Sequence, residues 1–301
     1  MIRTRTLSLS AIALASVLAL SACGGGGGDQ AEAELGTEAN PVQLGVVGAS
    51  EPYWSTYEEA VEAEGIQLEI VDFTEYTQPN PALSEGELDI NQFQHIQYLA
   101  DYNVSSGDDI QPIGATAIYP LGFYSEKYES VDQIPEGEEV VVPNDTVNQA
   151  RGLLVLQSAG LISLQDGGNA SSTLEDVIKD KSKVTVKALD AAVTVTSLPD
   201  VAGAIVNNDF INDAGLKPED ALAQDDPNDP SALPYVNIFA AQAKDVDNEV
   251  LQKLVEIYQT NQDVLDGAQE SAGGTAVFLK TPAEELQSSL EETETALRDA
   301  Q

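Results

Sequence analysis

Four side chains that carry a cationic or an amide group lie near predicted ends of helices and strands. Arg151 follows Asn148 by three residues in a segment of helical period, so both side chains share one face near the start of that helix. A guanidinium binds a carboxylate through paired hydrogen bonds, and a helix N-terminus adds free N–H groups. Asn207 and Asn237 close two predicted strands, where their amides can bond an ammonium or a carboxylate. On spacing alone, Arg151 could instead pair with a surface acid, and asparagine is common in turns and caps.

Four rings lie at predicted strand ends or turns, and one of them is the single histidine of the chain: Tyr76, Phe93, His95 and Tyr119. A ring-lined enclosure can bury a thioether, which is worth roughly 1.5 to 3 kcal/mol, with about 0.3 to 1.5 kcal/mol more from sulfur–aromatic contact. Taken singly, each ring is more typical of a core, and His95 of a structural histidine. Together with the four polar side chains, they predict a site for an apolar amino acid.

The composition excludes several other kinds of chemistry. The 301 residues include 51 Asp plus Glu against 13 Lys plus Arg, and the net charge of -38 repels the phosphates of a nucleic acid. One histidine and one cysteine are too few for a zinc site, and no intramolecular disulfide can form. The acidic run 225–229 lacks the glycine and glutamate of a calcium-binding EF-hand and is typical of a solvated loop. We therefore expect no cofactor, no metal and no nucleic-acid partner.

Residues 1–22 have the features of a secretory signal peptide. Two arginines precede an apolar run over residues 11–20, which is shorter than the ~20 residues that a bilayer-spanning helix needs. The following Leu20-Ser21-Ala22-Cys23 is similar to a bacterial lipobox, in which the cysteine thiol takes a diacylglyceryl group. An ordinary secretory peptide with a chance cysteine is the alternative.

Lipidation of Cys23 would make the protein a membrane lipoprotein. A second acyl chain, such as palmitate, would hold it firmly, because two chains anchor where one binds only marginally. Five glycines follow Cys23, so residues 23–41 are expected to form a flexible linker. We predict a location on the extracytoplasmic face of a cell membrane.

From residue 42 onward, apolar runs alternate with segments of helical period, which predicts an α/β fold with mostly parallel sheets. Strands are expected at 42–47, 67–73, 88–91, 139–142, 184–189, 203–206 and 235–240. Helices are expected at 57–64, before Gly86, at 93–102, 147–159, 250–258 and 282–299, with a turn at 78–81 and Asn144 as a helix cap. The order of elements suggests two lobes, 42–119 with 235–301 and 120–234, joined by two crossings around a ligand cleft.

The chain resembles the methionine-binding lipoproteins of the NlpA or MetQ type, which feed an ABC importer. The stretches that carry the resemblance are 44–51, 78–80, 82–89, 93–95 with 98–99, 119–120, 142–145 with Asn148 and Arg151, 160–162, 206–207 and 234–237. Two stretches depart from the family pattern. Residues 193–198 read Val-Thr-Val-Thr-Ser-Leu where Gln-Leu-Pro-Arg-Ser-Leu is common, and an acidic helix is added after Gly274.

The resemblance implies a two-lobe periplasmic-binding-protein fold of type II without enzyme activity. It implies that one group encloses the ligand side chain (Tyr76, Phe93, His95, Tyr119) and another holds the amino-acid head (Asn148, Arg151, Asn207, Asn237). It also implies a partner, an ABC permease with ATPase subunits, to which the closed and loaded protein delivers its ligand. The candidate ligands are L-methionine, D-methionine, a methionine dipeptide and another apolar amino acid.

Two other classes of function stay open at this point. One is an extracellular hydrolase that works with two carboxylates, and the other is a surface adhesin without a ligand. Because 51 acidic residues make some carboxylate pair almost inevitable, spacing does not single out a hydrolase. We expect capture without a covalent step, in which the ligand stabilises the closed arrangement of the lobes.

Overall fold

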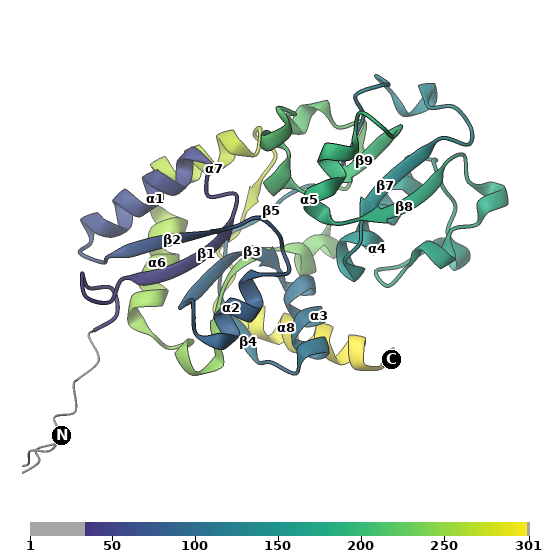
Figure 1. Cartoon of the computed structure of the whole chain (residues 1–301). Helices are drawn as coiled ribbons and strands as arrows, with labels where there is room; N and C mark the ends of the chain where they lie inside the picture. The colour runs from purple at the N-terminus through teal and green to yellow at the C-terminus, as the bar shows by residue number, and fades with distance from the viewer. Residues whose placement is uncertain (1–33, 300–301) are drawn as a thin grey trace, which may run out of the picture. The chain divides into compact units, whose positions relative to one another are not determined.

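The first five-stranded sheet places a returning strand beside strands from the N-terminal part of the chain. In this computed structural model, which describes residues 34–299, the strand order is β2-β1-β3-β11-β4 (Figure 1). The strands are β1 (Val42–Val47), β2 (Leu68–Phe73), β3 (Ile90–His95), β4 (Ile110–Ala115) and β11 (Asn237–Gln242). The last of these runs antiparallel to both neighbours, while β1, β2 and β3 are parallel. The predicted signal peptide, Cys23 and the linker up to residue 33 lie outside the described residues.

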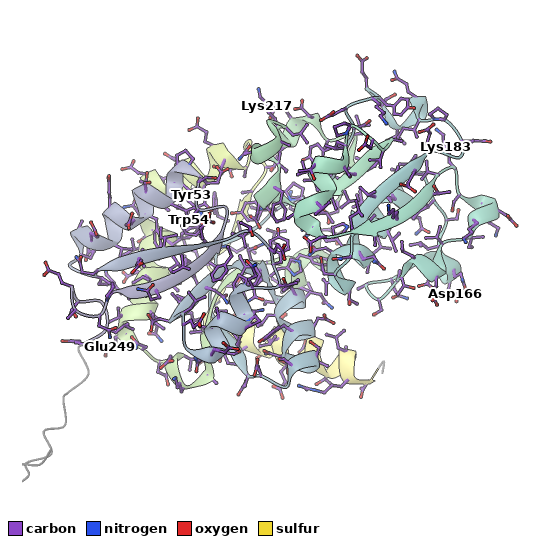
Figure 2. The ribbon with its side chains drawn as sticks, in the orientation of Figure 1. Tyr53, Trp54, Asp166, Lys183, Lys217 and Glu249 are labelled. Atoms are coloured by element: carbon purple, nitrogen blue, oxygen red, sulfur yellow. The ribbon has the colours of Figure 1, made fainter. Side chains whose placement is uncertain are left out.

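Helices cover both faces of this sheet. One face packs against α1 (Pro52–Ala63), α6 (Glu249–Thr260) and α7 (Gln262–Ser271), and the other against α2 (Pro79–Glu85), α3 (Ile96–Ser106) and α8 (Ala283–Asp299). The fully buried Tyr57 and Tyr258 meet edge to face under α1, with ring centroids 5.6 Å apart. Trp54, labelled in Figure 2, is 2% exposed and joins the same core.

The acidic C-terminal helix α8 packs on the body rather than fraying from it. Leu286 and Leu290 are buried in the core that α8 shares with α3. Asn103 Nδ2, on α3, donates a hydrogen bond to Glu294 Oε1 at 2.9 Å. The helix therefore covers the part of the sheet next to the edge strand β4.

The second sheet is also five-stranded, in the order β10-β6-β9-β7-β8. Its parallel strands are β7 (Glu139–Pro143), β8 (Thr185–Leu189) and β9 (Gly203–Val206), and its antiparallel pairs add β6 (Gly122–Tyr124) and β10 (Ala223–Gln224). α4 (Thr146–Ser158) packs on one face, and the short α5 (Ala191–Thr194) packs on the other. These three parallel strands correspond to the strands predicted at 139–142, 184–189 and 203–206.

Two crossings join the sheets. The outward crossing leaves β4 through β5 (Ala117–Ile118), which pairs with β12 (Val277–Phe278), and enters β6 after Leu121. The return crossing leaves β10 and passes a 3₁₀ helix, Pro230–Tyr235, before β11. The predicted two-lobe α/β fold is thus confirmed, while the limits 42–119, 120–234 and 235–301 stay predictions, because residues 34–299 belong to one compact unit. In that part of the chain, every helix is too short or too polar to cross a membrane.

Buried polar side chains explain why the boundary between β3 and α3 was misplaced. A strand at 88–91 and a helix at 93–102 were expected, whereas β3 continues to His95 and α3 begins only at Ile96. Every residue of β3 is buried. Gln94 Nε2 donates to Asn80 Oδ1 at 2.7 Å, so the amide is satisfied inside the core and its polarity does not mark a surface.

Three smaller expectations are also wrong. The run 78–81, expected as a turn, begins α2, where a proline in the first turn gives up no helical hydrogen bond. Asn144 does not cap α4, because Asp145 occupies that position. The strand expected from residue 235 begins only at Asn237, after the 3₁₀ helix.

Candidate functional site

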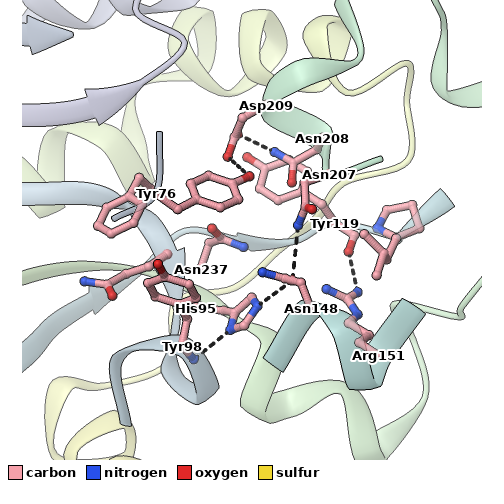
Figure 3. A pocket seen from close by; sticks show the side chains of 14 residues that line it. Tyr76, His95, Tyr98, Tyr119, Asn148, Arg151, Asn207, Asn208, Asp209 and Asn237 are labelled. Carbon is pink, nitrogen blue, oxygen red and sulfur yellow. Dashed lines mark hydrogen bonds between the residues drawn. The ribbon is translucent and has the colours of Figure 1, made fainter. Parts of the chain in front are cut away.

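A narrow cavity lies between the two sheets and is lined from both (Figure 3). All eight side chains that the sequence singled out line it: Tyr76, Phe93, His95, Tyr119, Asn148, Arg151, Asn207 and Asn237. Six further residues, which the sequence did not single out, complete the lining: Gln94, Tyr98, Pro120, Leu121, Asn208 and Asp209. The structure therefore brings the predicted set together, from Tyr76 to Asn237, which are 161 positions apart in the sequence.

Aromatic rings form one wall of the cavity. Tyr76 and Phe93 lie with ring centroids 5.9 Å apart, and Phe93 and Tyr98 meet edge to face at the same distance. Phe210 backs Tyr76 at 5.1 Å. Tyr98 lies on the first turn of α3, one turn after the strand that carries Phe93, so the strand-to-helix junction presents both rings to the same space. Such a wall suits an apolar or thioether side chain.

Arg151 is held inside the site by three partners. Its Nε donates to Asp225 Oδ2 at 2.6 Å, and its Nη2 donates to the carbonyl oxygen of Tyr119 at 2.8 Å. The Tyr235 ring lies 4.3 Å from the guanidinium carbon. The Arg151 side chain is only 7% exposed, and its acidic partner Asp225 is 28% exposed, so Arg151 does pair with an acid, as the alternative held, but from a buried position that lines the cavity. The hydrogen bonds that Arg151 makes to described residues use Nε and Nη2.

Asp225 is a site component that the sequence did not reveal. The acidic run 225–229 was expected to be a solvated loop, yet the first residue of that run bonds inward. Asp225 Oδ1 accepts a hydrogen bond from the Leu121 backbone at 2.8 Å, while Oδ2 binds Arg151. One carboxylate thus links the guanidinium to both crossings between the lobes.

Amide side chains form a hydrogen-bonded chain along the second lobe. Asp145, the N-cap of α4, accepts from Asn148 Nδ2 at 3.0 Å. Asn148 Oδ1 accepts in turn from Asn207 Nδ2 at 3.1 Å. Asn207 Oδ1 is buried and has no hydrogen-bond partner in the part of the chain that the structure describes. A buried acceptor without a donor costs about 1–3 kcal/mol, so it favours a ligand that brings an N–H group.

His95 is neutral, and its tautomer follows from its neighbours. Nδ1 accepts a hydrogen bond from the Tyr98 backbone at 3.1 Å, so the proton resides on Nε2. Nε2 faces Asn148 Oδ1 at 3.4 Å, across the two lobes. Burial, reinforced by the nearby charge of Arg151, lowers the pKa of His95 to about 3.

Asp209 is a second inward-facing acid from the second lobe. Its Oδ2 accepts from Tyr76 Oη at 2.7 Å, and its Oδ1 accepts from Asn208 Nδ2 at 2.7 Å. Burial raises the pKa of this carboxyl to about 7, and the nearby charge of Glu51 acts in the same direction, although both hydrogen bonds oppose it. Asp209 therefore changes its charge near neutral pH.

Asn237 completes the set from the first lobe. It is the first residue of β11, and its carbonyl oxygen accepts from the Thr116 backbone at 2.8 Å. This pairing holds the residue rigidly where the return crossing enters the sheet. Its side chain is 8% exposed and lines the cavity.

Two α/β lobes, two crossings and a cavity lined from both sides define a substrate-binding protein of the kind that serves an ABC transporter. The chain belongs to the NlpA lipoprotein family, whose model matches residues 42–277. Helix α8 lies beyond that match.

Similar proteins agree in sequence and in structure. The chain is 35% identical to the D-methionine-binding lipoprotein MetQ of Yersinia pestis over 243 residues, or 79% of this chain and 88% of that protein. An ABC-transporter periplasmic substrate-binding protein from Coxiella burnetii is 34% identical, with a TM-score of 0.73 over 79% of this chain and all of that one. A nutrient-binding protein from Burkholderia cenocepacia, whose structure was solved with methionine bound, is 35% identical. Its TM-score is 0.73, over 79% of this chain and 99% of that one.

These likenesses confirm three of the predictions from sequence. They confirm the family, the two-lobe binding-protein fold, and a role in binding in place of enzyme catalysis. The hydrolase and adhesin alternatives are set aside on the same grounds.

Proposed function

We propose that this protein captures methionine outside the cytoplasm and delivers it to an ABC importer. The observation that supports this most directly is the content of one cavity. Within the part of the chain that the structure describes, a guanidinium that bonds through Nε and Nη2 and a buried amide oxygen without a donor line the same cavity as a wall of aromatic rings. A small zwitterion with an apolar side chain matches all three features.

Each part of methionine has a partner in the proposed complex. The carboxylate binds Nη1 of Arg151, whose remaining nitrogens are already oriented by Asp225 and Tyr119. The α-ammonium donates to Asn207 Oδ1, which removes the cost of an unpaired buried acceptor. Asn148 and Asn237 complete the polar end of the site. The thioether lies among the rings of Tyr76, Phe93, His95 and Tyr119.

Capture needs no covalent step. Hydrogen bonds that join the lobes in this arrangement include those from Tyr76 to Asp209, from His95 to Asn148, and from Asn212 to Glu51. A ligand that bonds Arg151 and Asn207 in one lobe and packs on Phe93 in the other stabilises the closed arrangement by its differential affinity.

We further propose that Cys23 is acylated and holds the protein on the extracytoplasmic face of a cell membrane. The lipobox-like residues 20–23 and the names of the relatives, which are lipoproteins, support this location. The partner is an ABC permease with ATPase subunits, in keeping with the transporter named for the Coxiella burnetii protein.

Mass spectrometry of the ligand released from purified, denatured protein tests the proposed substrate. Protein purified without added amino acids should release methionine in near-equimolar amount. Chiral chromatography of the released material separates L- from D-methionine, and a dipeptide is recognised by its mass. Recovery of an unrelated metabolite in equimolar amount would contradict the proposal.

A further inference from the structure

The N-cap of α4 bonds to the ligand site as well as to its own helix. Asp145 Oδ1 accepts from the Asn148 backbone at 2.8 Å, which is the usual bond of an aspartate N-cap. The same carboxylate also accepts from the Asn148 side chain, at 3.0 Å through Oδ1 and 3.2 Å through Oδ2. Capping needs only the bond to the backbone N–H, so the bonds to the Asn148 side chain are additional.

These bonds fix which way the Asn148 amide faces. An ionised carboxylate only accepts hydrogen bonds, so it holds the NH₂ end of Asn148 and turns the oxygen end away. That oxygen then accepts from Asn207 Nδ2 at 3.1 Å. Since Nδ2 of Asn207 is committed to this bond, its Oδ1 is the end that remains for the cavity.

We propose that Asp145 is a positioning residue, which acts through Asn148 to aim Asn207 Oδ1 into the cavity as an acceptor for the ligand's α-ammonium. The inference rests on the proposed function, because it assigns a role in binding a free amino acid.

The chain Asp145–Asn148–Asn207 lies wholly in the second lobe. Asp145 and Asn148 belong to the start of α4, and Asn207 follows β9. The acceptor is therefore oriented before the lobes close. His95, from the first lobe, reaches Asn148 Oδ1 at 3.4 Å and reinforces the same orientation when they do.

The matched test compares two variants that each replace an aspartate N-cap by serine. Asp145→Ser keeps an acceptor for the helix, but the hydroxyl both donates and accepts, so the Asn148 amide is free to turn over. Asp190→Ser removes the same charge from the N-cap of α5 in the same lobe. Asp190 also lies close enough to act electrostatically on Tyr98, as Asp145 does.

Calorimetry with two ligands separates positioning from a general structural role. Methionine carries the α-ammonium, and 4-(methylsulfanyl)butanoate lacks it. Asp145→Ser should weaken methionine about three- to tenfold and leave the affinity of the des-amino compound unchanged, while Asp190→Ser changes neither. Equal losses for both ligands, or no loss at all, would overturn the inference.

A ligand-independent measurement keeps this test separate from that of the proposed function. Hydrogen exchange of the Asn207 side-chain amide, followed by nuclear magnetic resonance, should be at least tenfold faster in Asp145→Ser than in the wild type or Asp190→Ser. If the wild type bound no methionine, the proposed function would fail, and this exchange rate would still decide the inference. Equal rates in all three proteins would refute it.

Discussion

Tyr76 and Asp209 join the two lobes through a hydrogen bond of 2.7 Å from the phenol to the carboxylate. Tyr76 follows β2 in the first lobe, and Asp209 follows β9 in the second. Both side chains also line the cavity. The contact therefore couples the arrangement of the lobes to the site, and it contains a carboxyl whose pKa is raised to about 7.

Asp209→Asn should stabilise the protein at alkaline pH. The folded-state pKa of Asp209, about 7, lies above its ordinary 3.8, so its favourable contribution is full below pH 4 and is lost as pH rises through 7. The neutral amide avoids burying a charge, and we expect a gain of about 1–3 kcal/mol at pH 8. Thermal unfolding at pH 8 and pH 4 measures the difference, which should vanish at pH 4. The exposed Asp226→Asn is the control, and a loss of stability at pH 8 would contradict the prediction.

His95→Asn should reduce the sensitivity of the protein to acid. The folded-state pKa of His95, about 3, lies below its ordinary 6.5, so its contribution is full above pH 6.5 and is lost as pH falls toward 3. Asparagine keeps an acceptor for the Tyr98 N–H at the start of α3. The free energy of unfolding, measured by denaturant at pH 7 and pH 5, should fall less in the variant than in the wild type. A larger fall in the variant would refute the assignment.

The contributions of His95 and Asp209 oppose each other between about pH 4 and pH 6.5. As the pH falls through this range, the contribution of Asp209 to the free energy of unfolding grows, while the contribution of His95 shrinks. Over the same fall in pH, Asp209→Asn should therefore lose more stability than the wild type, and His95→Asn should lose less.

Asp225→Ala should weaken L-methionine binding by about tenfold or more. The change removes the partner of Arg151 Nε and the acceptor of the Leu121 amide, so the guanidinium loses its fixed orientation. Because Asp225 is 28% exposed, water replaces part of the lost pairing. The matched control is Asp226→Ala in the same acidic run, whose carboxylate bonds only to Asn228 among the described contacts. Equal calorimetric affinities of the two variants would remove Asp225 from the site.

Cys23→Ser should release the protein from the membrane. Acylation at this thiol is the proposed anchor, and the buried acyl carbons supply about 0.8 kcal/mol per CH₂. Detergent phase partitioning of the wild type and the variant, expressed in a bacterium that processes lipoproteins, measures the effect. The wild type should enter the detergent phase and the variant the aqueous phase. Recovery of both in one phase would contradict the proposed anchor.

The regular elements were predictable wherever apolar periodicity and a helix stop coincide. Strand β1 and helix α1 follow from alternating apolar residues, a helical stripe and Gly65, which adopts a positive φ after the helix. Strand β3 was misjudged because its amides are paired inside the core, and no local pattern shows that. Strand β4 and helix α7 were not predicted at all, since neither stands out against its flanking residues.

The site was predictable to the extent that side-chain types identify it. Arg151 and the asparagines stand out in an acidic chain, and all of them line the cavity. Asp225 and Asp209 could not be found in this way, because their roles depend on partners 74 and 133 residues away, and acids are the commonest polar residues here. Asp145 was not identified as the N-cap of α4, because its neighbour Asn144 is an equally good N-cap by residue type.

Titration calorimetry of L-methionine into ligand-free protein, with Arg151→Ala beside the wild type, tests the central claim most directly. The account predicts saturable binding at one site, and an affinity at least tenfold weaker in Arg151→Ala with the fold intact by circular dichroism. Equal affinity of the two proteins, or no binding by the wild type at about 1 mM methionine, would contradict it.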